Sequence, residues 1–177
     1  IELQESVAKA SVELLKQEKN PETKGTIIIG DSRNTNIADK LESYGINKVQ
    51  FVIYHPPYWD IIKFSDNEKD LSNCATIDDF NQSFGDVIDN TSRYLEKNRY
   101  CACVIGDKYA NSEIVPLGFH CMNLFLQRGF KLKAILVKNF EETKGKSNQK
   151  AIWRYRALAS DFYLFKHEYI FVFKKTF

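Results

Sequence analysis

The chain has 177 residues, which fits one domain that buries about two-thirds of the surface of its unfolded state. Hydrophobic residues make up 44% and charged residues 27%, a composition typical of a soluble globular domain. A net charge of +2 excludes overall basicity as a sign of a nucleic-acid partner, but the charges are unevenly distributed. Residues 58–90 carry eight acids and two bases, whereas residues 131–156 carry eight bases and two acids. The second sector suits phosphate groups and the first would repel them.

Cysteine and hydropathy patterns point to a reducing compartment. Cys101 and Cys103 alternate along an apparent strand, no CxxC pair occurs, and the three histidines are scattered. We therefore expect reduced core thiols and no metal site. No apolar run approaches the length of a membrane span and no signal peptide is visible, so we expect a cytoplasmic protein with no membrane partner.

The first part of the chain predicts two helices and two strands. Residues 6–19 have the spacing of an amphipathic helix. The β-branched run at 26–29 suits a buried parallel strand and ends in a polar turn at 30–33. A short helix is expected over 37–44, and the apolar run at 49–54 predicts a second buried strand.

The rest of the chain alternates helices and strands after a long polar loop at 60–77. A loop of this length favours a functional lid or a segment that a partner orders. The expected elements are, in order, a helix over 77–98, a strand over 101–105, a helix over 116–127, a strand over 132–139, and strands over 162–165 and 168–173. This order predicts one domain with a parallel sheet covered on both faces, and the last two strands form an antiparallel edge.

A proline pair stops the strand at 49–54, in the sequence Tyr54-His55-Pro56-Pro57-Tyr58-Trp59-Asp60. Neither proline can donate a ladder hydrogen bond, so the strand should end in a stiff corner at its carboxyl end. Ligands bind at that edge of open α/β sheets. The carbonyl of Pro56 and the ring of Tyr58 suit a planar base that carries an amino group. The alternative is a Pro-Pro turn whose aromatic residues cover the end of a core strand.

This corner, continued by Ile61-Ile62 and Phe64-Ser65, resembles the catalytic motif of DNA amino methyltransferases of the N-4/N-6 family. Those enzymes transfer a methyl group from S-adenosylmethionine to an exocyclic nitrogen of adenine or cytosine. The resemblance extends over nearly the whole chain. It implies a single methyltransferase domain over 1–177 with a Rossmann-like α/β fold. The sheet would be mostly parallel, with helices on both faces and an antiparallel C-terminal edge hairpin.

The resemblance implies catalytic roles for four residues: His55, Pro56, Pro57 and Tyr58. The side chain at 55 and the carbonyl of Pro56 would hold the amino hydrogens and aim the nitrogen at the methyl group. Tyr58 would stack on the flipped base. His55 stands where the family has Asp, Asn or Ser. A neutral imidazole offers one acceptor but no negative charge, so a working acceptor and a weakened catalyst both remain open.

The resemblance also implies a set of residues around S-adenosylmethionine: Glu2, Asp31, Ser32 and His55. Glu2 matches the acid that holds the ribose hydroxyls, and Asp31 and Ser32 would lie beside the adenine. The alternative for Asp31 is ordinary turn chemistry. The family also needs a glycine-rich loop after its first strand, and no GxG occurs among the eight glycines. We therefore expect that strand and loop to lie upstream of Ile1.

The basic segment at 141–156 mixes cations with aromatic residues. Cations suit phosphates, and indole or phenol rings can stack on bases. The alternative is a solvated loop whose aromatic residues pack on the core. With the indole of the corner, the expected DNA contacts are Trp59, Lys144, Lys146, Lys150, Trp153, Arg154 and Arg156. A second subunit could contact the acidic loop at 60–77. An RNA base methyltransferase and a catalytically silent binding subunit of the same fold remain alternatives.

Overall fold

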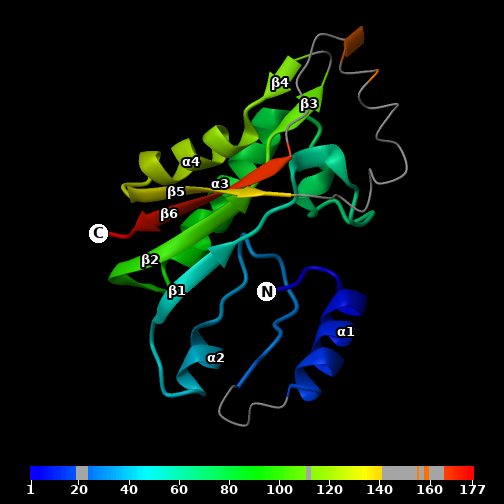
Figure 1. Cartoon of the computed structure of the whole chain (residues 1–177). Coiled ribbons are helices and arrows are strands. Elements are labelled where there is room, and N and C mark those ends of the chain that lie inside the picture. The colour runs from blue at the N-terminus through cyan, green and yellow to red at the C-terminus, as the bar shows by residue number, and fades with distance from the viewer. Residues whose placement is uncertain (19–23, 111–112, 141–154, 156–157, 160–165) are drawn as a thin grey trace.

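The computed structural model describes residues 1–18, 24–110, 113–140, 155, 158–159 and 166–177 (Figure 1). The helices are α1 (Glu5–Lys16), α2 (Ala38–Glu42), α3 (Ile77–Ser92) and α4 (Leu117–Gln127), with 3-10 turns at Trp59–Ile61 and Leu71–Asn73. The strands are β1 (Val49–Tyr54), β2 (Leu95–Ile105), β3 (Lys108–Ala110), β4 (Glu113–Val115), β5 (Lys131–Asn139) and β6 (His167–Lys174).

The main sheet has the strand order β1-β2-β6-β5. β1 pairs parallel with β2, and β6 pairs antiparallel with both β2 and β5. Three strands therefore run in one direction and only β6 opposes them. This arrangement confirms the predicted α/β fold with a mostly parallel sheet and an antiparallel C-terminal strand. The edge strand of that pair is β5, and the predicted strand at 162–165 lies outside the described residues.

Helices α3 and α4 cover one face of the sheet, which we call the helix-covered face (Figure 1). Phe84 of α3 and Phe125 of α4 meet the sheet residues Tyr54 and Phe173 there. The Phe125 ring stacks on Phe173 with centroids 4.4 Å apart, and its edge-to-face contact with Tyr54 has centroids 5.1 Å apart. Both helix phenylalanines are fully buried. Such aromatic contacts add to the free energy gained by burial.

The opposite face, which we call the open face, exposes apolar side chains from three strands. The exposed fractions are 48% for Phe51, 66% for Ile53, 40% for Tyr100 and 49% for Leu136. The sequence predicts helices on both faces, but α3 and α4 share one. The predicted burial of the strand at 49–54 is wrong for Phe51 and Ile53. β1 ends the sheet, and no described strand pairs with its outer edge.

The predicted strand at 26–29 is also wrong. Ile29 forms a single parallel bridge with Glu2, in which Glu2 N donates to Ile28 O (2.8 Å) and Gly30 N donates to Glu2 O (2.9 Å). A longer strand needs a neighbouring ladder, and the partner stretch is too short because α1 begins at Glu5. Ile29 is left 54% exposed. In Figure 1 this N-terminal segment lies beyond the β1 end of the sheet.

The predicted helix at 77–98 is too long. A capping box formed by Thr76 and Asp79 begins α3, and the helix ends at Ser92. Leu95 has the spacing of the apolar helical residues, but it is buried as the first residue of β2. Apolar spacing alone could not separate the two elements, because a single residue fits either period. The described short hairpin of β3 and β4 had no sequence signal.

Candidate active site

A groove of about 1040 Å³ runs along the carboxyl end of β1 and the N-terminal segment. Ligand sites of open α/β folds lie at this edge. The groove is lined by residues from three separate stretches that the sequence singled out: Glu2, Asp31, Ser32, His55, Pro56, Pro57 and Tyr58. The fold therefore brings the predicted catalytic residues and the predicted cofactor residues to one place.

Tyr54, the last residue of β1, fixes the start of the proline corner. This residue is buried, and its hydroxyl hydrogen-bonds with the hydroxyl of Thr91 at 2.9 Å. Burial raises the pKa of Tyr54, so the phenol stays neutral. Pro56 is buried and His55 is exposed, and the described residues contain no cis peptide bond. The corner is thus a trans, rigid platform with the imidazole on its accessible side.

Tyr58 is held through its hydroxyl group. The hydroxyl donates to Glu168 Oε2 at 2.6 Å, and Lys138 Nζ donates to Glu168 Oε1 at 2.8 Å. Burial and the bond to Glu168 raise the pKa of Tyr58. Burial alone would raise the pKa of Glu168, but the hydrogen bonds from Lys138 and Tyr58 lower it below its usual value. The tyrosine is therefore the donor and the glutamate the ionised acceptor.

His55 and Tyr58 lie close enough to act on one ligand. Their ring centroids are 6.0 Å apart and the ring planes are inclined by 52°. Both residues line the groove, together with Pro56. A planar group placed between them would meet an imidazole nitrogen, a carbonyl oxygen and an aromatic ring.

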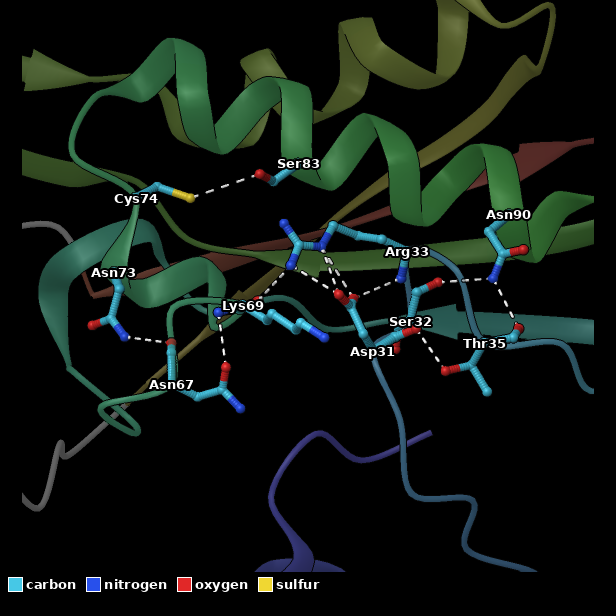
Figure 2. Close-up of polar contacts among 10 residues, drawn as sticks. All are labelled: Asp31, Ser32, Arg33, Thr35, Asn67, Lys69, Asn73, Cys74, Ser83 and Asn90. Carbon is cyan, nitrogen blue, oxygen red and sulfur yellow. Dashed lines mark hydrogen bonds and ion pairs between the residues drawn. The ribbon is translucent and has the colours of Figure 1, made fainter.

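The acidic turn presents an ion pair (Figure 2). Arg33 donates to Asp31 from its backbone N (2.9 Å), Nε (3.0 Å) and Nη2 (2.8 Å). Burial alone would raise the pKa of Asp31, but the bonds and charge of Arg33 lower it below its usual value. Arg33 Nη2 also donates to the carbonyl of Lys69 at 3.3 Å, which ties the turn to the loop at 60–77. The carboxylate is thus ionised but already partnered.

The turn is also fixed to α3. Asn90 is buried, and its side-chain amide donates to the carbonyls of Ser32 and Thr35, both at 3.0 Å (Figure 2). Gly30 allows the chain to fold back, because a Cβ there would lie 2.2 Å from Thr35 Oγ1. Ser32 is therefore positioned at the groove by contacts that its own residue type does not reveal.

Glu2 lies at the amino end of α1. Its Oε1 accepts from Gln4 N at 2.9 Å, and its backbone forms the bridge to Ile29. A carboxylate has about four lone-pair sites, so one such bond leaves acceptor capacity for ligand hydroxyl groups. The position suits the predicted cofactor role.

Trp59 lies beside the groove and does not line it. Its Nε1 donates to the carbonyl of Cys74 at 2.8 Å, and Lys108 Nζ lies 4.1 Å from the ring centroid. Lys108 also pairs with Asp60. Trp59 has a φ of 51°, in the left-handed region that L residues rarely adopt. Such strain persists only where surrounding contacts hold it. Here the contacts of Trp59 with Cys74 and Lys108 fix the end of the proline corner.

The loop at 60–77 is stabilised by its own polar groups. Asp70 is buried, and it accepts from Ser65 Oγ (2.7 Å), Ser72 N (2.9 Å) and Ser72 Oγ (2.8 Å). Asn73 Nδ2 donates to the carbonyls of Ser65 and Asn67, both at 2.9 Å. The loop thus has a defined internal structure next to the groove, with Asp70 as its centre.

The predicted DNA contacts of the basic segment lie outside the described residues: Lys144, Lys146, Lys150, Trp153, Arg154 and Arg156. Tyr155, which the structure does describe, is 72% exposed. None of the helices in the described part of the chain is long and apolar enough to cross a membrane. The four cysteines are free thiols. Cys101, Cys103 and Cys121 are buried in the core, as predicted, whereas Cys74 is only partly buried. Burial raises the pKa of Cys101 to about 12.

Four residues that the sequence did not single out shape the site: Arg33, Asp70, Asn90 and Glu168. Only Glu168 carried a usable signal, because it is an acid inside an otherwise apolar and aromatic strand. Arg33, Asp70 and Asn90 occupy polar stretches, where side chains of these types are ordinary. Their roles depend on contacts between distant segments.

No protein-family model matches the sequence, and no curated protein matches it. Solved structures do match the fold. A putative DNA modification methylase from Thermus thermophilus, complexed with S-adenosyl-L-methionine, aligns with a TM-score of 0.52 and 18% identity. The alignment covers 84% of this chain and 54% of the methylase.

Two further structures extend this similarity. A SAM-dependent methyltransferase from Methanosarcina mazei aligns with a TM-score of 0.56 and 8% identity, over 99% of this chain and 80% of that protein. The PvuII DNA methyltransferase, which is cytosine-N4-specific, aligns with a TM-score of 0.55 and 16% identity, over 87% and 50%. The chain spans about half the length of the two DNA methylases. At these identities the similarity establishes the Rossmann-like fold.

Proposed function

We propose that this chain carries the catalytic part of an S-adenosylmethionine-dependent methyltransferase that acts on DNA. The acceptor is the exocyclic amino nitrogen of adenine or cytosine. The observation that carries the proposal is the single groove in which His55, Pro56 and Tyr58 meet Glu2 and Asp31. The fold shared with methyltransferases supports it.

The corner acts by orienting an amine. An exocyclic amino group is a poor nucleophile because its lone pair is delocalised into the ring. The carbonyl of Pro56 and an imidazole nitrogen of His55 accept its two hydrogens, which favours tetrahedral geometry at nitrogen and directs the lone pair outward. Tyr58 stacks on the base, whose extrusion from the duplex costs a few kcal/mol.

The groove suits the cofactor at its N-terminal side. Glu2 has acceptor capacity for ribose hydroxyls, and the turn at Asp31 and Ser32 is fixed beside apolar residues that suit an adenine ring. S-adenosylmethionine, when bound, supplies the electrophilic methyl group. The residues of this chain hold and orient the acceptor base.

The groove also suits a β-strand from elsewhere in the protein. Ile1, Glu2 and Leu3 form one wall, and Phe51 and Ile53 of the unpaired β1 edge form the other. A parallel strand between these walls would bury the exposed apolar side chains and satisfy the β1 edge. We propose that the first strand and its glycine-rich loop, lying upstream of Ile1, occupy this place.

DNA contacts are assigned to the basic segment with Trp59. Alanine at Lys144, Lys146 and Arg154 together should weaken binding to duplex DNA and reduce the dependence of log K on log[salt] by about 3, since each phosphate contact contributes about 1 to the slope. A matched control replaces three exposed lysines elsewhere in the chain: Lys9, Lys16 and Lys40. Equal slopes for the two triple variants would remove the segment from the interface.

The experiment that tests the function is methyl transfer from labelled S-adenosylmethionine by the full-length protein, on duplex DNA and on RNA. We expect transfer to DNA, and a loss of about 100-fold in His55→Ala and Tyr58→Ala, the size typical of positioning effects. Transfer to RNA alone, or no binding of the cofactor in a calorimetric titration, would contradict the proposal.

His55 favours one second candidate, a catalytically silent subunit of the same fold. An imidazole cannot supply the negative charge that stabilises a developing cation on the amine. His55→Asp separates the two: a large gain of methyl transfer over an inactive wild type supports the silent subunit, whereas a loss supports a working histidine.

A further inference from the structure

Tyr58 is fixed by more than its place in the proline corner. Its hydroxyl bonds to Glu168, on β6, which is 110 residues away in the sequence. Its ring lies against Gly106, just after β2, where a Cβ would approach Tyr58 Cε2 to 2.8 Å. Two neighbouring strands therefore determine where the ring lies.

Burying the carboxylate of Glu168 costs free energy, yet the residue is buried. Glu168 is 6% exposed, and its charge is balanced by Lys138 of β5 at 2.8 Å and by the Tyr58 hydroxyl at 2.6 Å. Only the carboxylate of the pair is buried, because the Lys138 side chain is 57% exposed, so the pairing offsets only part of the free energy that burial of the charge costs. Stability alone therefore does not account for a carboxylate at this position, whereas fixing the direction of one phenol does.

Gly106 also restricts where the ring of Tyr58 can lie. Any side chain at Gly106 would push the ring of Tyr58 away. With one part of the ring against Gly106 and the hydroxyl tied to Glu168, the rest of the ring borders the groove beside His55. A hydrogen bond to an ionised acceptor is stronger than a neutral one, so the hydroxyl end of the side chain is held at Glu168 and the ring cannot swing about the Cα–Cβ bond without breaking that hydrogen bond.

We propose that Glu168 is a positioning residue that holds the hydroxyl end of Tyr58 and, together with the contact at Gly106, fixes where the ring lies, so that the ring offers a pre-oriented stacking surface to a planar nucleobase. The inference rests on the proposed function for the identity of the ligand. Its structural part, the restraint on the ring, stands apart from that function and can be tested without DNA.

The first measurement uses the free chain with ring-labelled tyrosine, and the Tyr58 resonance is assigned by its loss in Tyr58→Phe. We expect Glu168→Ala to shift the Tyr58 ring signal, because the hydroxyl end of the side chain is released, and Glu168→Gln to restore most of the wild-type signal. The matched control is Asp89→Ala, which breaks the pair between Asp89 and Arg128 that joins α3 to the end of α4 at 2.8 Å. An unchanged Tyr58 signal in Glu168→Ala overturns the proposal.

The second measurement uses duplexes with 2-aminopurine at a mismatch, where extrusion of the base costs least. We expect Glu168→Ala to reduce the protein-induced fluorescence change by about threefold or more, because a displaced ring stacks less well on the extruded base. DNA affinity should be little altered, because it depends mainly on phosphate contacts. Tyr58→Phe should give a similar loss, and the double variant no further loss, because both remove one bond. Additive losses overturn the positioning role. No fluorescence change in the wild type overturns the proposed function, while the ring signal still decides the restraint.

Discussion

The two faces of the main sheet are made by alternate residues of the same strands, yet they differ in how far their side chains are buried. The helix-covered face packs Phe125 between Tyr54 and Phe173, and its side chains are fully or nearly buried. The open face leaves Phe51 and Ile53 about half or more exposed. Both sets of residues are equally apolar in the sequence.

This difference shows which face of the sheet is fully packed by the described residues. On the helix-covered face the core side chains find their partners within the described residues. On the open face, next to the groove, the apolar pattern belongs to a surface that suits another segment or chain. The residues of the candidate site lie at the boundary between the two faces. Stability should therefore come from one face and ligand binding from the boundary.

The largest effect is expected when one phenylalanine from each face is replaced by alanine and the two losses of stability are compared. Phe125→Ala should lower the free energy of unfolding by about 3–5 kcal/mol, because it leaves a cavity among four aromatic rings. Phe51→Ala is the matched control, and the loss should be about 1 kcal/mol or less because the ring is half exposed. Urea unfolding measures both. Similar losses would remove the distinction between the faces.

The next effect concerns the loop at the boundary. Asp70→Ala should cost about 1–3 kcal/mol at neutral pH, because it leaves the buried donors of Ser72 and the partly buried hydroxyl of Ser65 without an acceptor. Burial alone would raise the pKa of Asp70, but the hydrogen bonds from these serines lower it below 3.8.

The acid dependence of stability follows from that lowered pKa. A carboxylate with a lowered folded-state pKa stabilises the fold above its unfolded value of 3.8, and this contribution is lost as the pH falls below it. The difference between wild type and Asp70→Ala should therefore shrink below pH 3.8. A difference that stays constant with pH would show that the carboxylate is not ionised in the fold.

A smaller effect is expected at the start of α3, on the helix-covered face. Thr76→Ala removes the capping box with Asp79 and should cost about 1 kcal/mol. Thr76→Ser keeps the hydroxyl acceptor and should recover most of that loss. Thermal unfolding followed by circular dichroism measures both variants. Equal melting temperatures for the alanine and serine variants would argue against the cap.

The smallest effect is expected on the open face. Ile53→Thr keeps the β-branched shape on a side chain that is 66% exposed, and it should change stability by about 0.5 kcal/mol or less. Urea unfolding of the wild type and the variant measures this change. A large loss of stability in the chain itself would mean that the open face is already covered.

The sequence was informative where a pattern had a local cause. The proline corner, α4 between Pro116 and Gly129, and β5 follow from residues close together in the chain. The pairing of Glu168 with Tyr58 and of Asn90 with the turn at Ser32 could not be predicted, because each joins segments whose spacing carries no signal.

The two errors about strands had one physical origin. The run at 26–29 and the strand at 49–54 have the β-branched, apolar composition of buried strands. Composition reports what a strand can bury, whereas burial needs a neighbour, and the described residues supply none on these edges. The exposure of Ile53, which the sequence predicts to be buried, therefore indicates an interface.

The unpaired edge of β1 has a consequence for handling the protein. Its free N–H and C=O groups, flanked by exposed apolar side chains, form a template on which a second chain can add a strand. Concentrated solutions of this polypeptide should therefore tend toward aggregation through β1.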